Sequence, residues 1–394
     1  MASGTALKSL QTKMTQKKRF CVGIDATALP LQPVGAGNYT IQLIRALVKL
    51  ESDLDLVVFA HPHGQALIDI PEHNGFHWSL VPSHSPAMRL LWEQTGFPRL
   101  IRQEGIDLLH SLHYTRPLRL PSASVVTFHD MTFFLFPELH TFAKRIFFPA
   151  AIRSSARTAD AIIAISESTR QDAIRLLDID PARIHTVLLG VTDEFRPIPA
   201  SQQLISIREK YRLPEHFILY VGMLEPRKNL PLLLRAYKQV VERGKAPVLV
   251  LAGRMGWGVS PLQQMISDLA LTEQVHFTGY IVPEDLPFVY NLADLFVYPS
   301  LYEGFGLPPL EALACGTPVI TSAVSSIPAN MGEAAILVQP DDEAGLSTAI
   351  WEALNNPELR RELSIKGPLQ AAKFTWETTA RQTLTIYQQV LQNQ

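Results

Sequence analysis

Short apolar runs rich in β-branched residues alternate along the chain with longer amphipathic stretches. This alternation is typical of parallel β-strands joined by α-helices. The pattern runs through the first half and starts again near residue 217, so it predicts two doubly wound α/β sheets. The predicted strands are 20–25, 54–60, 107–111, 124–130, 161–166 and 184–190 in the first half, and 217–222, 247–253, 275–280, 295–300, 318–322 and 335–338 in the second.

Breaks in this pattern predict the domain boundaries. The chain has 394 residues, more than one ordinary hydrophobic core needs. Residues 191–205 hold two prolines and show no clear periodicity, so they are the expected linker. We expect a disordered leader (1–19), an N-terminal Rossmann-like domain (20–195), a C-terminal Rossmann-like domain (196–373) and a final amphipathic helix (374–394).

Composition and charge narrow the range of partners. The chain has 35 Lys and Arg against 37 Asp and Glu, a net charge of −2, which gives no overall field that would attract nucleic acid. Its only two cysteines, Cys21 and Cys315, lie in segments that look buried, which argues against a disulfide framework. Neither a signal peptide nor an apolar run of about 20 residues is evident. We therefore expect a cytoplasmic protein that meets a membrane only from its inner surface.

Two features of the first half could carry chemistry. Gly35 and Gly37 stand between a predicted strand and a helix, where backbone N–H groups can approach a phosphate or a sugar closely. A tight turn that needs glycine for its backbone alone explains the same pattern equally well. His129 closes a predicted strand, where its ring would point toward a ligand at the strand ends, although a satisfied structural histidine is the alternative.

The second half offers a pair of cations. Arg227 and Lys228 follow the first strand of the second sheet and precede a helix. Together with a helix N-terminus they can bind a diphosphate and neutralise it as it departs. A solvated surface pair is the alternative, but the position at the expected ligand edge of the sheet favours a functional role.

Two glutamates flank a glycine- and proline-rich turn further along. Glu303 lies in the turn after the predicted strand 295–300, and Glu311 lies in the first turns of the next helix. Each carboxylate can accept hydrogen bonds from vicinal hydroxyls, one pair on a hexose and one on a ribose. The alternative for Glu311 is an acid stabilised by the helix dipole, which does not account for Glu303.

In sequence order, these motifs resemble the retaining GT-B glycosyltransferases of family four. "EGFGLPPLE" is similar to the E-x7-E signature of that family, and "GAGNYT", "FHD", "SESTRQD", "GMLEPRKNL" and "VHFTGYI" follow its order. The resemblance covers the chain from about residue 20 onward. It implies an α/β GT-B fold, with an acceptor domain and a nucleotide-sugar donor domain that face a central cleft, and a C-terminal helix that crosses back to the first domain.

The resemblance also implies roles for individual residues. Glu303 would contact the donor hexose near the reacting centre, Glu311 the ribose, and Arg227 with Lys228 the leaving diphosphate. His129 would meet the sugar. The remaining donor-site residues would be Gly222, Gly35, Gly37, Tyr280, Ile281, Gly304, Phe305, Gly306 and Leu307. One departure is Asn38–Tyr39, where many relatives carry an arginine after the glycines, so that a phosphate or acceptor contact there does not carry over.

Taken together, these features predict a retaining hexosyltransferase that uses GDP-mannose, needs neither metal nor cofactor, and acts by front-face attack on the donor sugar. A UDP-sugar-dependent transferase is the alternative donor assignment. A sugar-nucleotide epimerase and a non-catalytic nucleotide-sugar binder on the same fold are the alternatives of another class. The acceptor stays open among a glycan, a polyprenyl-linked glycan and a small molecule. Residues 87–103 and 142–157 mix cations with aromatic residues, and could rest on anionic lipid or be ordinary amphipathic helices.

Overall fold

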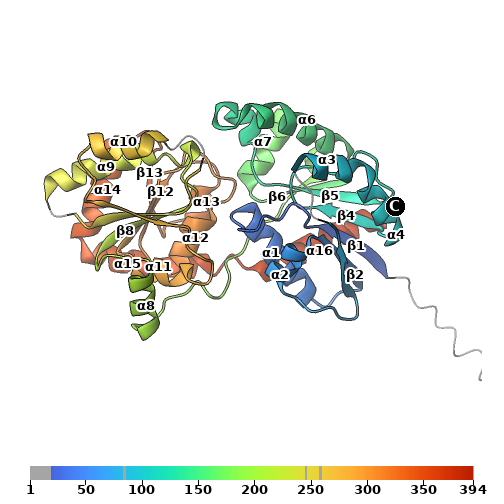
Figure 1. The fold of residues 1–394 in the computed structure, drawn as a ribbon, viewed down its shortest axis with the longest axis horizontal. Coiled ribbons are helices and arrows are strands. Elements are labelled where there is room, and N and C mark those ends of the chain that lie inside the picture. Colours follow the sequence, from blue (N-terminus) through green and yellow to red (C-terminus); the bar gives the residue numbers. More distant parts are fainter. Residues whose placement is uncertain (1–18, 83–85, 245, 257–259, 394) are drawn as a thin grey trace, which may run out of the picture.

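The computed structural model describes residues 19–82, 86–244, 246–256 and 260–393, and these form two α/β units (Figure 1). Most of the expected leader, residues 1–18, lies outside the described residues, whereas Arg19 pairs with Asp55 at 3.3 Å. Each unit is built on one sheet in which every strand pairing is parallel.

The first unit has a seven-stranded sheet in the order β3-β2-β1-β4-β5-β6-β7. Its strands are β1 (Phe20–Asp25), β2 (Leu54–Ala60), β3 (Phe76–Leu80), β4 (Leu108–Ser111), β5 (Ala123–Phe128), β6 (Ala161–Ala164) and β7 (Ile184–Thr186). Its helices are α1 (Ala36–Lys49), α2 (Pro62–Ile68), α3 (Pro86–Thr95), α4 (Phe97–Gln103), α5 (Thr132–Leu135), α6 (Phe142–Thr158) and α7 (Glu167–Leu177).

The second unit has a six-stranded sheet in the order β10-β9-β8-β11-β12-β13. Its strands are β8 (Phe217–Val221), β9 (Val248–Ala252), β10 (Val275–Gly279), β11 (Leu295–Tyr298), β12 (Val319–Ser322) and β13 (Ile336–Val338). Its helices are α8 (Gln202–Lys210), α9 (Leu230–Arg243), α10 (Ser260–Asp268), α11 (Leu286–Leu292), α12 (Leu307–Ala314), α13 (Ile327–Met331), α14 (Glu343–Asn355) and α15 (Pro357–Ala371), and α16 (Trp376–Gln392) ends the chain. Figure 1 shows α9 and α10 on one side of this sheet and α11 and α15 on the other.

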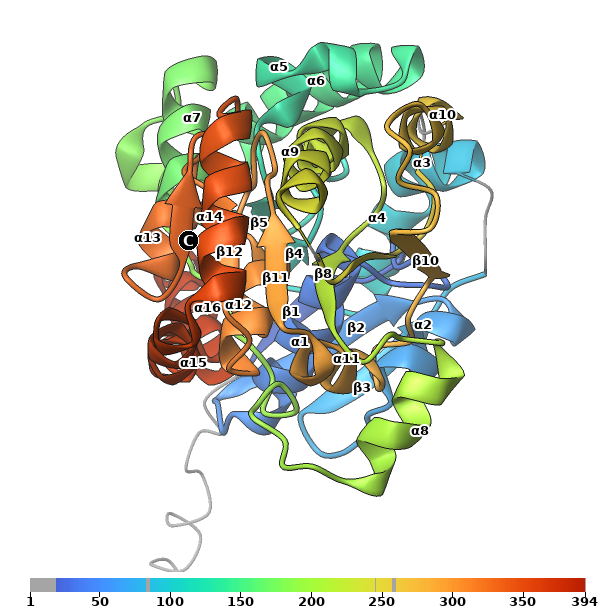
Figure 2. The same cartoon turned by 90° about the vertical axis from the view of Figure 1, so that its left-hand side faces the viewer.

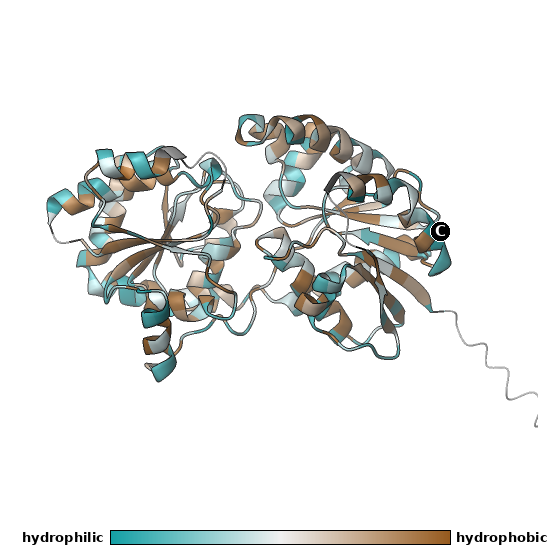
Figure 3. Cartoon of the chain, viewed as in Figure 1, coloured by the Kyte–Doolittle hydropathy of each residue, from teal (hydrophilic) through white to brown (hydrophobic). Residues whose placement is uncertain are grey.

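The central strands are apolar because helices cover both faces of each sheet. All six residues of β5 and all four of β12 are buried, which explains why these strands read as continuous apolar runs. Figure 3 shows the hydrophobic residues concentrated on the strands and on the helix faces that meet them. The hydrophobic core of each unit therefore fixes the strand ends from which the site residues project.

Two of the strand predictions need correction. Strand β3 was not predicted, because it is an edge strand of five residues in which exposed His77 stands between buried Phe76 and Trp78. The predicted strand 184–190 ends at Thr186, since the chain then turns away toward the start of α16. A side chain at Gly190 would meet the backbone of Trp376, so this crossing requires glycine.

Helix α16 packs on the first unit, against α1, β5 and β6. The hydroxyl of Tyr387 lies 2.6 Å from Nδ1 of His110, and Nε2 of His110 lies 2.8 Å from the Thr127 hydroxyl. Tyr39 of α1 joins this buried network at 2.9 Å from Thr127. These hydrogen bonds connect the last helix of the chain to the sheet of the first unit.

The two segments considered for lipid contact differ in the structure. In residues 87–103, the aromatic side chains face inward: Phe97 is fully buried and Trp92 stacks on it at 4.9 Å. The packing of Phe97 and Trp92 therefore favours the alternative of ordinary amphipathic helices for this segment. In α6, by contrast, Phe142, Ile146 and Phe147 are exposed, while Phe148 stacks on Phe133.

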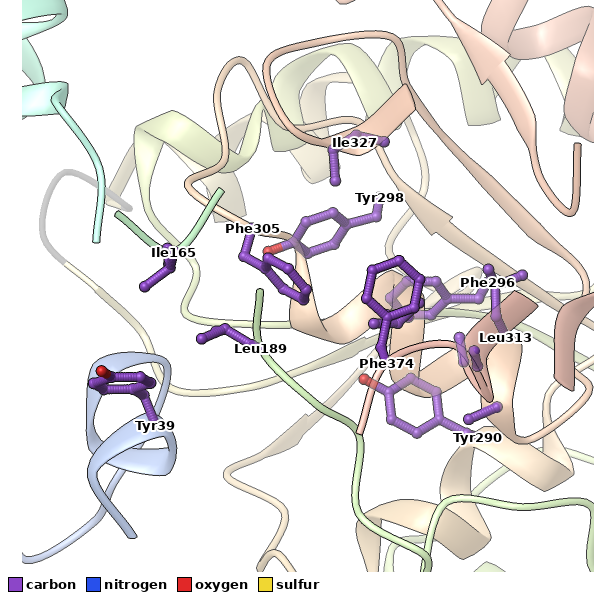
Figure 4. Close-up of a cluster of buried hydrophobic side chains, with 14 of the residues drawn as sticks. Tyr39, Ile165, Leu189, Tyr290, Phe296, Tyr298, Phe305, Leu313, Ile327 and Phe374 are labelled. Carbon is purple, nitrogen blue, oxygen red and sulfur yellow. The ribbon is translucent and has the colours of Figure 1, made fainter. Parts of the chain in front are cut away.

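The carboxyl ends of the two sheets meet. Gly304, after β11, lies against the carbonyl of His129, after β5. Tyr302 donates a hydrogen bond to Asp172 of α7 at 2.8 Å, and Arg254, after β9, donates to the Gln32 side chain, after β1, at 2.8 Å. Phe305 belongs to a core cluster shared by both units, between Tyr298 of the second and Ile165 and Leu189 of the first (Figure 4). Figure 2 views this arrangement from the second unit.

Candidate active site

The two predicted cations lie in a tight turn after β8. Residues Pro226–Lys228 form one turn of 3-10 helix, and Asn229 in the left-handed conformation leads directly into α9. Arg227 donates to the carbonyl of Tyr302 at 2.9 Å and pairs with Glu225 at 3.0 Å. Lys228 is only 6% exposed, and its Nζ donates to the Tyr298 hydroxyl at 2.6 Å. The solvated-pair alternative is therefore wrong for Lys228.

Glu303 pairs with both cations. Its Oε1 lies 2.6 Å from Lys228 Nζ, and its Oε2 lies 3.2 Å from an Arg227 guanidinium nitrogen. Burial alone would raise the pKa of Glu303, but the charges of Lys228 and Arg227 lower it to about 2. Burial lowers the pKa of Lys228, while the charge of Glu303 acts in the opposite direction. Buried Glu303 and Lys228 and half-buried Arg227 thus form a cluster of ion pairs at the carboxyl ends of the adjacent strands β8 and β11.

The turn that carries Glu303 is held in place by its backbone. The Ser325 hydroxyl accepts from the Glu303 N–H at 2.9 Å and lies 2.7 Å from the Glu303 carbonyl. Asn330 donates to the Phe305 carbonyl at 2.7 Å, and Gly306 has a φ of 89°, which favours glycine and allows α12 to begin at Leu307. Hydrogen bonds to the backbone thus hold residues 304–307, the predicted donor turn between β11 and α12, in a conformation that places Glu303 beside the two cations.

Glu311 has a different environment. It lies on α12, is 8% exposed, and accepts a hydrogen bond from the Tyr290 hydroxyl at 3.0 Å. Burial raises the pKa of Glu311 to about 7, and no described ion pair offsets this shift. The helix dipole is therefore not the dominant influence on this acid. The two signature glutamates differ sharply in protonation: Glu303 is ionised, and Glu311 is half protonated near neutral pH.

His129 is oriented by one backbone hydrogen bond. Its Nε2 lies 2.8 Å from the Leu112 carbonyl, which can only accept, so Nε2 carries the proton. Burial lowers the pKa of His129, so the ring is neutral and its Nδ1 is an acceptor. Tyr39 packs edge-on against the ring at 5.1 Å. The backbone of His129 touches Gly304, where an added Cβ would lie within contact distance of the His129 carbonyl oxygen.

The other predicted residues lie around this cluster at different places. Gly222 follows β8 with a φ of 154°, and Ile281 is a buried core residue after β10. Half-buried Tyr280 lies beneath the Arg254 guanidinium, 5.5 Å from the ring centre. Gly35, with a φ of 50°, caps α1, and a Cβ at Gly37 would meet Pro33 rather than any residue of the second unit. The structure thus brings together Arg227, Lys228, Glu303, Gly304 and His129.

Sequence reasoning missed three residues of the cluster. Glu225 balances Arg227, Tyr298 holds Lys228, and Ser325 holds the Glu303 backbone. Glu225 lies two positions before Arg227 in the motif "GMLEPRKNL", so the sequence itself indicated a negative charge next to the cations. Tyr298 and Ser325 reach the site only through the adjacency of β8, β11 and β12, which the sequence pattern does not specify.

Among the described residues, none of the helices is long and apolar enough to cross a membrane. The same residues contain no group of three or more His, Cys, Asp or Glu side chains that could hold a metal ion.

Comparison with known proteins covers almost the whole chain. Residues 204–370 match the family model described as glycosyl transferases group 1, and residues 33–195 match that of glycosyltransferase family 4. The chain is 32% identical over 368 residues to the O-antigen chain mannosyltransferase B of Escherichia coli, which covers 90% of this chain and 95% of that protein. It is 26% identical over 341 residues to the O-antigen chain mannosyltransferase RfbU of Salmonella typhimurium, covering 83% and 89%.

Solved structures with the same fold include sucrose-phosphate synthase from Thermosynechococcus elongatus, with a TM-score of 0.75, 22% identity and coverage of 95% of this chain and 100% of that one. Anabaena Alr3699/HepE in complex with UDP-glucose also has a TM-score of 0.75, with 17% identity and coverage of 94% and 100%.

Proposed function

The chain belongs to the GT-B glycosyltransferases of family four, and from that premise we propose that it transfers mannose from GDP-mannose to a glycan hydroxyl with retention of configuration. It is a hexosyltransferase, and two O-antigen mannosyltransferases are among its relatives. The choice of mannose rests on the names of these relatives, which do not specify the nucleotide, and HepE was solved with UDP-glucose.

One observation carries the mechanism: the buried cluster of Lys228, Arg227 and Glu303 at the junction of the two units. A nucleotide sugar with its diphosphate on the two cations would place its hexose beside Glu303. The cations would then stabilise the negative charge that develops on the departing diphosphate. Because Lys228 is buried and Arg227 is half-buried, their interaction with that charge is stronger than it would be in water.

Retention follows from attack on the same face that the leaving group departs from. The acceptor oxygen forms a bond to the anomeric carbon while the bond from that carbon to the β-phosphate oxygen breaks, and the acceptor proton passes to the phosphate oxygen that leaves. Lys228 and Arg227 supply the positive charge that a divalent cation supplies in other transferases, so we propose transfer without a metal. Neutral His129 would accept a hydrogen bond from a donor-sugar hydroxyl through Nδ1.

The remaining donor contacts extend away from the cluster. Glu311 would accept hydrogen bonds from the two ribose hydroxyls, and the backbone at Tyr280–Ile281 would flank the base. Gly222 would permit close approach of the diphosphate. The Gly35–Gly37 loop would reach the diphosphate and the acceptor from the opposite unit, to which Arg254 already connects it through Gln32.

Helix α6 supports a contact with anionic lipid on the cytoplasmic face of a membrane. Phe142 and Ile146 are 75% and 61% exposed, and the helix carries four cations and no acidic residue. Exposed bulky apolar residues beside cations are what an interfacial helix requires. Such a contact would bring the enzyme to a lipid-linked acceptor.

A ligand screen tests the donor assignment. We expect GDP-mannose and GDP, but not the uridine nucleotides, to raise the melting temperature of the protein, because a ligand at about 100 times its Kd adds about 2.7 kcal/mol to the stability of the folded state. The rise should be the same with and without EDTA. It should be much smaller in Lys228→Ala. Selectivity for UDP-glucose would overturn the guanosine assignment. Isomerised nucleotide sugar in the absence of an acceptor would indicate an epimerase, and tight binding without turnover would indicate a non-catalytic binder.

A further inference from the structure

A second polar cluster lies in the first unit, away from the donor-site cations. Asp25 is the last residue of β1 and Ser111 the last of β4, and the two are register partners on adjacent strands. Register partners in a parallel sheet project from the same face, so the Asp25 carboxylate and the Ser111 hydroxyl are neighbours. Glu93, from α3, accepts a hydrogen bond from Thr115, four residues after Ser111, at 3.3 Å, and this places its carboxylate at the same end of the sheet. All three are buried, with exposures of 8%, 1% and 2%.

Asp25 Oδ1 accepts from the N–H of Thr27 at 2.9 Å and from its hydroxyl at 2.6 Å, whereas Ser111 and Glu93 are less well satisfied. The Ser111 Oγ has no partner among the described residues, although it is fully buried. Among the described residues, Glu93 accepts from Thr115 at 3.3 Å and from Gln94 at 3.2 Å, and pairs with Arg89 at 3.4 Å. Buried polar groups in native proteins are normally satisfied, and an exception implies a ligand or an ordered water.

Several side chains lie between this cluster and the reaction site. Arg89, next to Glu93, is close enough to His113 for its charge to affect the pKa of that ring. The rings of His113 and His129 lie 5.5 Å apart, and His129 touches Gly304 beside Glu303. Arg89 is 19% exposed, whereas Glu93 is only 2% exposed, so a ligand would reach the cluster past the Arg89 side chain. The cluster is therefore on the acceptor side of the site, at the carboxyl ends of the first sheet.

We propose that Asp25, Glu93 and Ser111 form a subsite for the acceptor, and that they bind hydroxyl groups of a neutral sugar. This inference rests on the proposed transferase function and specifies its acceptor. Carboxylates accept hydrogen bonds from vicinal hydroxyls, and a serine hydroxyl can both donate and accept. Two buried carboxylates repel a phosphate, so the subsite favours an uncharged glycosyl residue over a phosphorylated acceptor.

The environment of Glu93 agrees with this assignment. Burial raises the pKa of Glu93 to about 7, with the charge of Asp25 adding to the shift. Sugar hydroxyls would add hydrogen-bond donors to those that Thr115, Gln94 and Arg89 already give this carboxylate, and so would favour its ionised form.

The test measures acceptor binding separately from donor binding. Methyl α-D-mannopyranoside serves as the probe, with saturation-transfer NMR on the GDP-loaded enzyme and transfer from labelled GDP-mannose as the two readouts. We expect Ser111→Ala and Glu93→Gln to weaken probe binding and raise its KM about 5- to 20-fold, with GDP affinity unchanged. Mannose 6-phosphate should bind the wild type at least 10-fold more weakly than the probe, and Glu93→Gln should narrow that ratio.

Ser111→Ala is the more decisive variant, because removing a hydroxyl that has no protein partner should not lower the stability of the fold. Glu104→Gln is the matched control: it alters a carboxylate of the same unit whose contacts are with Ser79 and His77. Unchanged probe binding in both cluster variants, or no probe binding to a wild type that binds GDP, would overturn the subsite and leave the donor proposal intact. If the wild type binds UDP instead, the GDP assignment fails, and the same comparison on UDP-loaded enzyme still decides the subsite.

Discussion

Glu311 gives the sharpest prediction, because its protonation should report both on stability and on nucleotide binding. Burial raises its pKa from 4.5 to about 7 in the folded protein. The folded state therefore holds the proton more tightly than the unfolded state, so stability falls as the pH rises from about 4.5 to about 7 and stays lower above that range. A shift of this size corresponds to about 3 kcal/mol as an upper bound.

Replacement of Glu311 by Gln removes this titration. The amide keeps an oxygen that can accept from Tyr290, so the hydrogen bond survives. We expect the variant to match the wild type in urea denaturation at pH 4 and to exceed it by about 1–3 kcal/mol at pH 8. Since the same side chain is assigned to the ribose, nucleotide affinity should fall about 10- to 30-fold in spite of the gain in stability.

Proton release links the two effects. If ribose hydroxyls donate to Glu311, they favour its ionised form, so that binding should expel more protons at pH 6, where Glu311 is largely protonated, than at pH 8. Calorimetry of GDP-mannose binding in buffers of different ionisation enthalpy measures the number of protons released, and the diphosphate diester of the donor does not itself titrate here. Glu303 contributes none, because its cations keep its pKa near 2. Equal proton release in the wild type and Glu311→Gln at pH 6, or an equal stability gain at pH 4 and pH 8, would refute the reasoning.

Three further substitutions test other parts of the structure. Glu303→Gln leaves Lys228 buried without its carboxylate partner, so we expect urea denaturation to show a stability lower by about 2–4 kcal/mol. Transfer should be at least 100-fold slower, and free GDP should bind more tightly because the cations are no longer paired. Weaker binding of GDP would contradict this role of the ion pairs. Arg254→Ala removes the contact with Gln32 and should raise the ratio of donor hydrolysis to transfer about 3- to 10-fold, whereas an unchanged ratio would show that this contact does not aid closure. Tyr387→Phe deprives buried His110 of a partner and should cost about 1–3 kcal/mol without changing GDP affinity, and a loss of affinity would place α16 in the site.

The core of the fold was predictable because parallel strands covered on both faces leave a strong signal. Strands such as β5 and β12 are uniformly apolar, and the sequence shows each of them as a short β-branched run. Edge strand β3 lacks that signal, since each of its faces carries an exposed residue, His77 on one and Leu80 on the other. The end of β7 was also missed, because it depends on where α16 crosses the chain at Gly190, a contact made by residues nearly 190 positions later.

The sequence predicted which residues form the donor site, but not which of them pair with one another. Motif position identified Arg227, Lys228 and Glu303, yet nothing in the sequence implied that a carboxylate 75 residues away would pair with both cations. That pairing exists because β8 and β11 are neighbours although two other strands intervene in the sequence. Ser111 and Asp25 are likewise brought together only by strand adjacency.

The charges of the donor site imply that a bound nucleotide sugar replaces existing ion pairs of the protein and does not simply add new contacts. Arg227 and Lys228 are balanced by Glu225 and Glu303, so the buried cluster is close to neutral before any ligand arrives. A diphosphate added to that arrangement would leave uncompensated negative charge in a buried site, which is costly. The cations become available only if Glu303 releases them, and a released carboxylate needs new hydrogen-bond donors. A hexose attached to the diphosphate supplies such donors through its hydroxyls, whereas free GDP does not. The ion pairs seen here would therefore favour the intact donor over its product and couple release of the nucleotide to loss of the sugar.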